Sequence, residues 1–299
     1  MGELMSKTLG IILAGGKSSR LYPATFATTK QVLPIYDKPL IYYPLSTLML
    51  AGIRDFVIIT TPEESDVFKS LLWDAEERMG IHIEFAKQDQ PRGIADAFNV
   101  VDDWIEYGEY TRFALILGDN IFYGAGMTEI LSRATNDAST TIIATKVKDP
   151  ERFGVVQLAG NGEVLDMEEK PSKPKSDLAI TGLYFFNKSV FQRARMLKPS
   201  KRGELEITDL VKTYMKDGAL TAIKMPRGSI WFDTGTPDAL LEASNLIQMI
   251  QKHQGFMVGN PHEIAYNKGW IGADALKETA LLCEKSAYGQ YLLALLDSA

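Results

Sequence analysis

Short apolar runs alternate with longer helix-like segments over the first part of the chain, and this alternation constrains the fold more than any other feature. Short apolar runs that end in turn residues are typical of buried strands. Strands that alternate with helices of this length indicate βαβ units, so we expect an α/β fold with a mixed, mostly parallel sheet. The predicted strands are Leu9–Ala14, Phe56–Thr60, Ile81–Ala86 and Phe113–Leu117, and the predicted helices are Pro39–Gly52, Glu63–Met79 and Ile94–Ile105.

The pattern changes in the second half, where strand-like segments follow one another with short connections. We expect them to add extra or antiparallel strands around a second site, of the size of a sugar. Past Gly255 the chain is expected to form short helices. The strands of this half are predicted over Thr140–Val147, Val155–Leu158, Val164–Met167, Ile180–Phe186 and Ser229–Phe232, and the helices over Glu206–Lys216 and Pro237–His253.

The charge balance limits the classes of partner. A net charge of −6 argues against a protein that binds nucleic acids or membranes in general, because such proteins need a basic surface. An anionic small substrate is compatible with this balance, since a few local cations suffice. Lys17, Arg20, Lys30 and Lys38 lie close together near the N-terminus and could provide them.

Cysteine and histidine usage narrows the chemistry. The single cysteine, Cys283, allows no disulfide within the chain and no cysteine-based zinc site. The three histidines are scattered, which argues against a nucleophile activated by histidine. The short polar segment Met1–Thr8 is not typical of a signal peptide, and no apolar run has the length of a membrane span. We therefore expect a cytoplasmic protein.

The segment Gly10–Arg20 has the composition of a phosphate-binding loop. It fails the P-loop pattern by one residue, because five residues instead of four separate Gly10 from Gly16-Lys-Ser, and it does not match G-x-G-x-x-G. Glycines still let backbone N–H groups approach phosphate oxygens, and Arg20 can bind such oxygens in bidentate fashion. A tight turn with solvated cations is the alternative interpretation of this segment alone.

The residues that follow make a resemblance specific. Gly15-Gly16-x-x-x-Arg20-Leu-x-Pro23, followed by Lys30 and Pro34, resembles the signature of sugar-1-phosphate nucleotidylyltransferases. The stretch Tyr36–Ser46 resembles the glucose-1-phosphate thymidylyltransferase branch of that family. Further matching blocks, in order along the chain, are Leu117–Gly124, Glu168–Pro171, Thr181–Tyr184, Arg202–Thr208 and Asp233–Thr236.

The resemblance implies a Rossmann-like fold with three layers, of the nucleotide-diphospho-sugar transferase type. It places a catalytic domain over residues 8–254, with a nucleotide-binding part over about 8–124 and a sugar-phosphate-binding part over about 125–254. A helical extension over 255–299 would contact other subunits of a homotetramer. The nucleotide-binding residues that it implies are Leu13, Ala14, Gly15, Gly16, Ser18, Ser19, Arg20, Gln31, Gln88, Pro91, Gly93 and Asp119.

Ser18 departs from the family pattern, which usually has Gly-Thr where this chain has Ser18-Ser19. Ser19 keeps the hydroxyl, whereas Ser18 lacks the backbone freedom of glycine. We expect the loop to bind a triphosphate nevertheless.

Two aspartates end apolar strands far apart in the sequence. Asp119 follows one strand and Asp233 ends another, 114 residues later. Ligands collect at the carboxyl ends of strands in open α/β sheets, and Mg²⁺ takes few protein oxygens in addition to waters and phosphates. By resemblance both are Mg²⁺ ligands, although a single aspartate at a strand end is more often a turn or cap residue.

The sugar-phosphate pocket is also assigned by resemblance. Sugar hydroxyls need acceptors and a phosphate needs fixed cations, so the chemistry is consistent. Taken alone, Glu168-Glu169-Lys170 would be a solvated charged turn. The implied pocket residues are Asn120, Gly154, Glu169, Lys170, Ile180, Tyr184 and Arg202.

Base recognition is expected from Gln88 and the segment Pro91–Ala95, which contact thymine in the family. A glutamine amide can pair with the edge of a pyrimidine, and Gly93 would let the backbone approach the base. Thymine and uracil share that edge, so the choice between them depends on packing around one methyl group, which separates substrates by only about 1–3 kcal/mol.

The implied reaction is that of glucose 1-phosphate with dTTP to give dTDP-glucose and pyrophosphate, the first step toward dTDP-rhamnose or a related deoxysugar. The attacking phosphate oxygen is already an anion, so no general base is needed and the protein supplies positioning and charge neutralisation. Arg20 would hold the leaving pyrophosphate with Mg²⁺, Lys30 the α-phosphate region and Lys170 the attacking phosphate. We predict that no side chain acts as an essential base.

Three alternatives remain open from the sequence: another nucleotide such as UTP or another hexose 1-phosphate, a P-loop NTPase, and a silent regulatory subunit. The family often binds its end product at a second site between subunits. The residues at or near that site are Tyr123, Gly124, Arg227, Glu263 and Ile264, while Asn267 stands where the family often has arginine.

Overall fold

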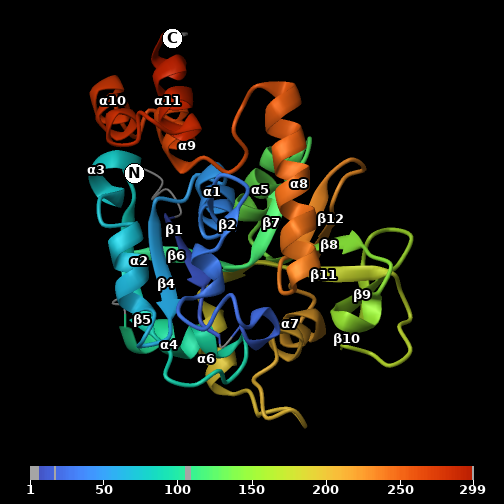
Figure 1. Cartoon of the computed structure of the whole chain (residues 1–299). Coiled ribbons are helices and arrows are strands. Elements are labelled where there is room, and N and C mark those ends of the chain that lie inside the picture. The colour runs from blue at the N-terminus through green and yellow to red at the C-terminus, as the bar shows by residue number, and fades with distance from the viewer. Residues whose placement is uncertain (1–6, 17, 105–108, 298–299) are drawn as a thin grey trace, which may run out of the picture.

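A computed structural model describes residues 7–16, 18–104 and 109–297 (Figure 1). Nine strands form one sheet in which the order β10-β9-β11-β6-β1-β4-β5 is extended by β8, which pairs with β11 and β12. The bounds of these strands are β1 Lys7–Leu13, β4 Asp55–Thr60, β5 His82–Lys87, β6 Tyr110–Leu117, β8 Thr140–Lys146, β9 Gly154–Leu158, β10 Val164–Glu169, β11 Leu178–Asn187 and β12 Leu220–Lys224.

The half of the sheet formed by β6, β1, β4 and β5 is entirely parallel. Alternate residues of β1 enter two different cores: Ile12 packs with Ile58 and Ile116 on one face, and Ile11 packs with Val57 and Leu115 on the other. Both sets of side chains are apolar because both faces of the sheet are covered. The strands therefore appear in the sequence as continuous apolar runs. The predicted α/β fold with three layers is confirmed.

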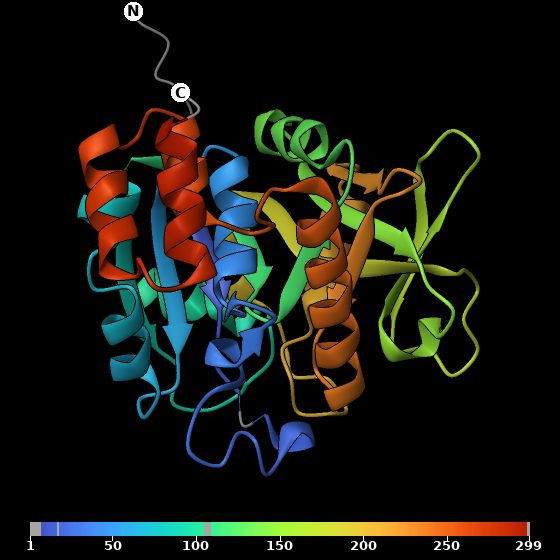
Figure 2. The same ribbon diagram turned by 45° about the horizontal axis from the view of Figure 1, so that its top comes forward.

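Helices cover the two faces of this sheet (Figures 1 and 2). The first core includes residues of α1, α3, α5 and the C-terminal helices, and the second includes residues of α4, α6 and α7. The helix bounds are α1 Tyr42–Leu50, α2 Ser65–Leu71, α3 Ala75–Met79, α4 Asp96–Trp104, α5 Met127–Asn136, α6 Ser189–Arg195, α7 Ile207–Lys216, α8 Pro237–Gln254, α9 Pro261–Asn267, α10 Ala273–Leu282 and α11 Ala287–Asp297.

The second half of the chain makes the sheet mixed. β11 runs antiparallel to β6, β8 and β9, and β9 runs antiparallel to β10, as the change of pattern in the sequence predicted. In Figure 2, β9 and β10 lie at one end of the molecule and the C-terminal helices lie toward the other. One continuous sheet therefore carries strands from both parts of the predicted catalytic domain.

Several elements differ from the prediction, since α5, α6 and β12 were not predicted. The predicted helix over 63–79 is divided into α2 and α3, and the chain turns at 72–74 so that Ala75 and Met79 join the core that contains the C-terminal helices. The strand pair β7 (Asn120–Tyr123) and β13 (Ile230–Asp233) forms a separate small sheet, as do β2 (Pro34–Ile35) and β3 (Lys38–Pro39). No helix in the described ranges combines the length and the apolar character needed to cross a bilayer.

Candidate active site

The predicted phosphate loop leaves β1 at the point where the strand order changes direction. After β1 the chain proceeds outward through β4 and β5, and it then returns to place β6 on the other side of β1. Such switch points form crevices at the carboxyl ends of parallel strands. The N–H of Gly118 donates to the carbonyl of Leu13 at 2.9 Å, so the loop after β1 and the segment after β6 lie side by side.

Ser18, which departs from the family pattern, has a left-handed backbone conformation with φ 44° and ψ 31°. Its hydroxyl donates to the carbonyl of Gly16 at 3.3 Å, and its own carbonyl accepts from Thr25 Oγ1 at 3.1 Å. The loop thus keeps a backbone path suited to glycine although it carries a serine, and these two hydrogen bonds offset part of the cost. Lys17 lies outside the described residues.

Arg20 reaches across the site to the second half of the chain. A Cβ placed on Gly235 would lie 2.6 Å from a terminal nitrogen of Arg20 and 3.3 Å from Oδ1 of Asp233. A side chain at position 235 would displace the Arg20 guanidinium from this place. The glycine of the Asp233–Thr236 block therefore has a physical reason, and Arg20 lies beside the carboxylate that was predicted to bind metal.

Asp119 and Asp233 are brought together by the β7–β13 pair. Asp233 lies opposite Asn120 in that pair, and Thr234 donates to the carbonyl of Asp119 from its N–H at 3.1 Å and from its hydroxyl at 2.8 Å. Burial, followed by the charge of Asp119, raises the pKa of Asp233, while Lys30 and Arg20 oppose the rise. Lys30 Nζ contacts Asp119 Oδ2 directly.

Two adjacent carboxylates that repel one another fit a hard divalent cation, which takes one or two such ligands and completes its shell with waters and phosphates. No group of three or more potential ligand side chains occurs in the described ranges. Asp119 and Asp233 alone therefore provide too few ligands for a closed structural metal site, and their role as ligands of an ion shared with a substrate stays a prediction.

A cavity of about 610 Å³ opens beside the phosphate loop. Gly15, Gly16, Gln88 and Pro91 are among the residues that line it. Gln31 is buried nearby and its Oε1 accepts from the hydroxyl of Thr29. Four of the predicted nucleotide-binding residues thus share one cavity, while Asp119 is not part of its lining.

Gly93 does not line this cavity and packs against the backbone of Leu205. A Cβ on Gly93 would lie 2.5 Å from the carbonyl oxygen of Leu205, and Gly93 has φ 106°. Leu205 in turn donates to the carbonyl of Arg92 at 2.7 Å and accepts from the N–H of Ala95 at 3.2 Å. The structure thus gives Gly93 a packing role between two segments, and its contact with the base stays a prediction.

Most predicted sugar-phosphate residues form one cluster at the β9–β10–β11 end. A Cβ on Gly154 would lie 3.2 Å from Oε2 of Glu169 and 3.7 Å from the side chain of Ile180. Arg202 lies 3.7 Å from Oε1 of Glu169, and Thr208 donates to Oε2 of the same carboxylate. Lys170, which has φ 44°, is exposed beside them.

Asn120 and Tyr184 connect this cluster with the carboxylate pair. Asn120 donates to Asp119 Oδ1 at 3.0 Å, and its own Oδ1 accepts from Gly182 N–H at 3.1 Å and from Trp231 Nε1 at 2.6 Å. Burial and the charge of Glu169 raise the pKa of Tyr184. A polar route thus leads from Asp119 to β11 of the sugar-phosphate side.

Comparisons with known proteins decide the family. The model of the nucleotidyl transferase family matches residues 9–249 of this chain. The chain belongs to the nucleotidyl transferase family. A glucose-1-phosphate thymidylyltransferase from Neisseria meningitidis is 48% identical over 96% of this chain and 99% of its own length. The corresponding Xanthomonas campestris protein is 49% identical over 97% of this chain and 98% of its own length.

Solved structures agree with this assignment. A Bacillus anthracis protein assigned as a glucose-1-phosphate thymidylyltransferase and solved with sucrose superimposes with a TM-score of 0.72 at 40% identity, over 80% of this chain and 94% of that one. A UDP-glucose pyrophosphorylase solved with UDP-glucose has a TM-score of 0.71 at 25% identity, over 82% of this chain and 99% of that one. The predicted family is confirmed.

A second cavity, of about 270 Å³, lies away from the phosphate loop of this nucleotidyl transferase. Tyr123, Gly124, Glu263 and Ile264, which were predicted for an end-product site, all line it, and so does Asn267. Arg227, predicted for the same site, is exposed and does not line this cavity.

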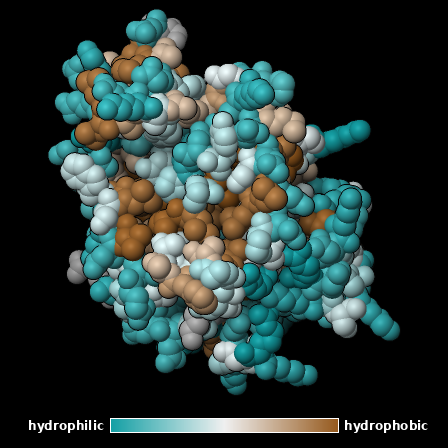
Figure 3. Space-filling view, in the orientation of Figure 1, coloured by the Kyte–Doolittle hydropathy of each residue, from teal (hydrophilic) through white to brown (hydrophobic). Residues whose placement is uncertain are grey.

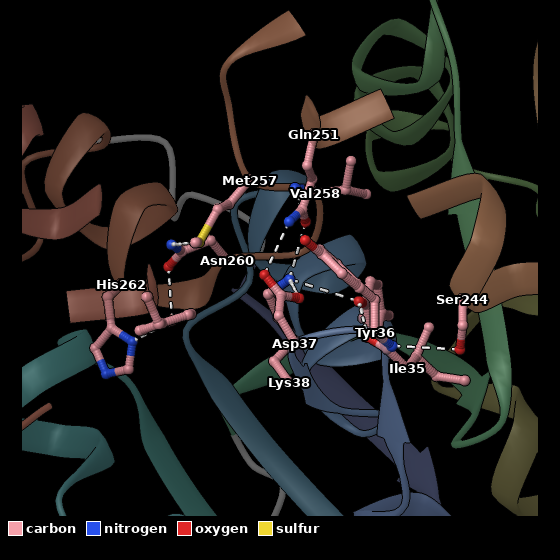
Figure 4. A network of polar contacts seen from close by, with 12 residues as sticks. Ile35, Tyr36, Asp37, Lys38, Ser244, Gln251, Met257, Val258, Asn260 and His262 are labelled. Carbon is pink, nitrogen blue, oxygen red and sulfur yellow. Dashed lines mark hydrogen bonds and ion pairs between the residues drawn. The ribbon is translucent and has the colours of Figure 1, made fainter. Parts of the chain in front are cut away.

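Lys38 was predicted, with the other N-terminal cations, to be available to an anionic substrate. The structure contradicts this prediction, because Lys38 is buried and paired. It is only 3% exposed and donates to Asp37 at 2.5 Å and to Gln251 at 3.1 Å, an arrangement that Figure 4 shows between the β2–β3 turn and α8. Burial lowers the pKa of Lys38, although Asp37 opposes this. Its role is to join the β2–β3 turn to α8.

Several residues that contact predicted site residues were not found from the sequence, and three of them are of particular interest. Thr208 binds Glu169, Trp231 binds Asn120, and Asp96 binds Gln88 at 2.8 Å. Thr208 stood within a matching block and could have been considered. The sequence near Trp231 and Asp96 does not indicate their roles. The partner of Trp231 lies on another element, and the partner of Asp96 lies at the far end of a turn.

Proposed function

We propose that this nucleotidyl transferase moves a thymidylyl group from dTTP to glucose 1-phosphate, giving dTDP-glucose and pyrophosphate. The observation that carries the proposal is that the phosphate loop and the Asp119–Asp233 pair lie together at the carboxyl edge of the sheet. The cavity of about 610 Å³ lies beside the phosphate loop, and Asn120 joins Asp119 to Gly182 of β11, a strand of the proposed sugar-phosphate side. Relatives named glucose-1-phosphate thymidylyltransferase match over nearly their full length, which supports these substrates.

The chemistry needs charge neutralisation more than proton transfer. An oxygen of the sugar phosphate attacks the α-phosphorus in line and pyrophosphate leaves, so the barrier is the repulsion between two anions. Arg20 would bind the departing phosphates, Lys30 the α-phosphate region and Lys170 the attacking phosphate. Asp119 and Asp233 would hold Mg²⁺, which supplies further neutralisation at phosphate oxygens when bound.

Lys30 must exchange partners for this to occur. In the structure its ammonium group is paired with Asp119, so that each side chain neutralises the other. An incoming nucleotide would offer Lys30 a phosphate. We propose that this exchange accompanies substrate binding and frees Asp119 for the cation.

The test is a steady-state assay of pyrophosphate release with dTTP, UTP and CTP against glucose 1-phosphate, with the product identified by mass spectrometry. The expected result is dTDP-glucose, formed only when both substrates and Mg²⁺ are present. Nucleotide hydrolysis without the sugar would indicate an NTPase. Tight binding of both substrates without turnover would indicate a silent regulatory subunit, and a preference for UTP would indicate the uridylyl branch.

Regulation and assembly follow the same proposal. We propose that the cavity lined by Tyr123 and Glu263 binds the end product of dTDP-rhamnose or related deoxysugar synthesis.

We also propose that the enzyme is a cytoplasmic homotetramer. Apolar side chains gather near the middle of the face in Figure 3 and again on the C-terminal helices, where Leu281 and Leu282 are exposed, and these surfaces support contacts between subunits. Inhibition by dTDP-rhamnose against dTTP and light scattering of the purified protein test the two parts.

A further inference from the structure

Asp96 is a buried carboxylate at the first turn of α4, and only 1% of its surface is exposed. Three side chains donate to it. Gln88 Nε2 lies 2.8 Å and Arg92 Nε 3.1 Å from Oδ2, and Asn99 Nδ2 lies 3.2 Å from Oδ1. A buried carboxylate with this many partners is held in one place, and so are the groups that donate to it.

The chemistry of the contact determines which way the Gln88 amide faces. An ionised carboxylate only accepts hydrogen bonds, so the end of the amide that meets Asp96 has to be the nitrogen. The opposite end, Oε1, then faces the phosphate loop, where a Cβ on Gly15 would lie 3.9 Å from it. Gln88 and Gly15 both line the nucleotide cavity, so an acceptor is presented to whatever base enters there.

The surroundings of Asp96 keep this orientation from relaxing. The Arg92 side chain is 62% exposed and covers the Asp96 side chain, which is 2% exposed. The carbonyl of Arg92 accepts from the N–H of Leu205 at 2.7 Å, which ties the turn to a segment of the sugar-phosphate side. The acceptor is therefore organised before the base arrives, which strengthens discrimination.

We infer that Asp96 is a positioning residue that sets the base selectivity of the nucleotide cavity, by fixing Gln88 so that Oε1 receives a ring N–H donor. This rests on the proposed function. Thymine and uracil carry a donor at N3, whereas cytosine carries a lone pair at that position. Cytosine placed in the same way would bring its N3 lone pair against Gln88 Oε1, so that two acceptors face each other. A site that depends on a hydrogen bond rejects a base that cannot form this bond.

The decisive variant is Asp96→Asn, which keeps the shape of the side chain and adds a donor. Asparagine can either accept from Gln88 or donate to it, so the Gln88 amide is free to turn and present its nitrogen to the base. The expected result is a fall of about tenfold or more in the ratio of kcat/KM for dTTP to that for dCTP. The ratio for dTTP to dUTP should stay unchanged, because these bases share the edge concerned.

Matched controls separate positioning from general damage. Asn99→Ala removes a donor to the other carboxylate oxygen and leaves the Gln88 contact intact, so it should keep the ratio of dTTP to dCTP. In a Gln88→Leu background, Asp96→Asn should change the ratio no further, because the group that it positions is gone. Arg92→Gln, which alters only an exposed partner, should lower the ratio in the same direction by a smaller factor.

The outcomes are distinguishable. Equal losses of kcat/KM for dTTP and dCTP in Asp96→Asn would overturn the inference and leave Asp96 a structural residue. If Asp96→Asn does not fold, an unchanged ratio in Arg92→Gln would overturn it equally. Failure of the proposed function is separate, since the wild-type protein would then release no pyrophosphate with dTTP and glucose 1-phosphate.

Discussion

Lys30 and Asp119, which stand 89 residues apart in the sequence, form a direct ion pair at the carboxyl edge of the sheet. Both side chains are largely buried, with 16% and 12% of their surfaces exposed. Each side chain neutralises the other, because an unpaired charge in this partly buried position would be costly. Lys30 is therefore held near the place where a phosphate of the nucleotide is proposed to bind.

Replacing Lys30 by alanine is expected to lower kcat/KM for dTTP by about 10²–10³-fold, because a preorganised charge that acts on a transferring phosphate is lost. Lys30→Arg should recover part of the activity, since it keeps the charge but not the geometry. Lys69→Ala, at an exposed lysine on α2 that pairs with Asp66, is the control and should retain full activity. Near-normal turnover of Lys30→Ala, measured by pyrophosphate release, would contradict the proposed role.

Lys170 should act on one substrate only. Because its neighbours Glu169 and Arg202 belong to the sugar-phosphate cluster, Lys170→Ala is expected to raise KM for glucose 1-phosphate about tenfold or more, with a much smaller change in KM for dTTP. Lys173→Ala, which removes an exposed lysine three residues later, should change neither constant. Equal increases in both KM values for Lys170→Ala would show that this lysine serves the nucleotide as well.

Ser18 holds a left-handed conformation that costs a residue with a side chain about 1–2 kcal/mol. Ser18→Gly should remove that cost, and the greater freedom of glycine in the unfolded chain takes back about 0.5–1 kcal/mol. We expect the free energy of unfolding in urea to stay equal or rise by up to about 1.5 kcal/mol, with activity retained.

Two further substitutions serve as controls for the Ser18 prediction. Ser18→Val places a β-branched side chain at a positive φ and should destabilise the protein and reduce activity. Ser19→Gly, at a neighbour without a positive φ, should gain nothing. A clear loss of stability in Ser18→Gly would mean that the hydrogen bond from the Ser18 hydroxyl to the carbonyl of Gly16 outweighs the backbone strain, because the bond from Thr25 to the carbonyl of residue 18 is kept.

The sequence predicted well those parts of the fold that are determined by the pattern of neighbouring residues. Ile11 and Ile12 are both fully buried, so β1 is an uninterrupted apolar run that is easily recognised. The helix α5 was left unassigned although Met127, Ile130 and Leu131 have helical spacing, so that omission was avoidable. The small β7–β13 sheet was out of reach, because its four-residue strand β7 is defined only by pairing with β13 more than a hundred residues later.

The candidate site divides in the same way. Motif residues such as Arg20 and Asp119 could be named from spacing and resemblance, because the family pattern marks them. The contacts that orient them depend on tertiary packing: Arg20 needs the space beside Gly235, and Asn120 needs Trp231. Lys38 shows the opposite error, since proximity in sequence to Lys30 suggested a shared role that its burial excludes.

His262 should make the stability of the protein sensitive to acid. Burial lowers the pKa of His262 to about 4, and its Nδ1 lies 2.8 Å from the hydroxyl of Tyr288. The unfolded chain binds a proton near the ordinary value of 6.5, whereas the folded protein does so only near 4, so stability is full above pH 6.5 and falls as the pH drops toward 4. The loss from this group amounts to about 3 kcal/mol across that window.

Urea denaturation at a series of pH values between 7 and 4 measures this dependence. His262→Gln, which cannot gain the proton, should be less stable than the wild type at pH 7 but should lose less stability on acidification. His82→Gln controls for the removal of a histidine as such, because His82 is exposed and contacts only Glu84 among the hydrogen bonds described for its ring. If His262→Gln and the wild type lose stability in parallel between pH 6.5 and 4, the acid sensitivity arises elsewhere, and the carboxylates paired with arginine and lysine become its source.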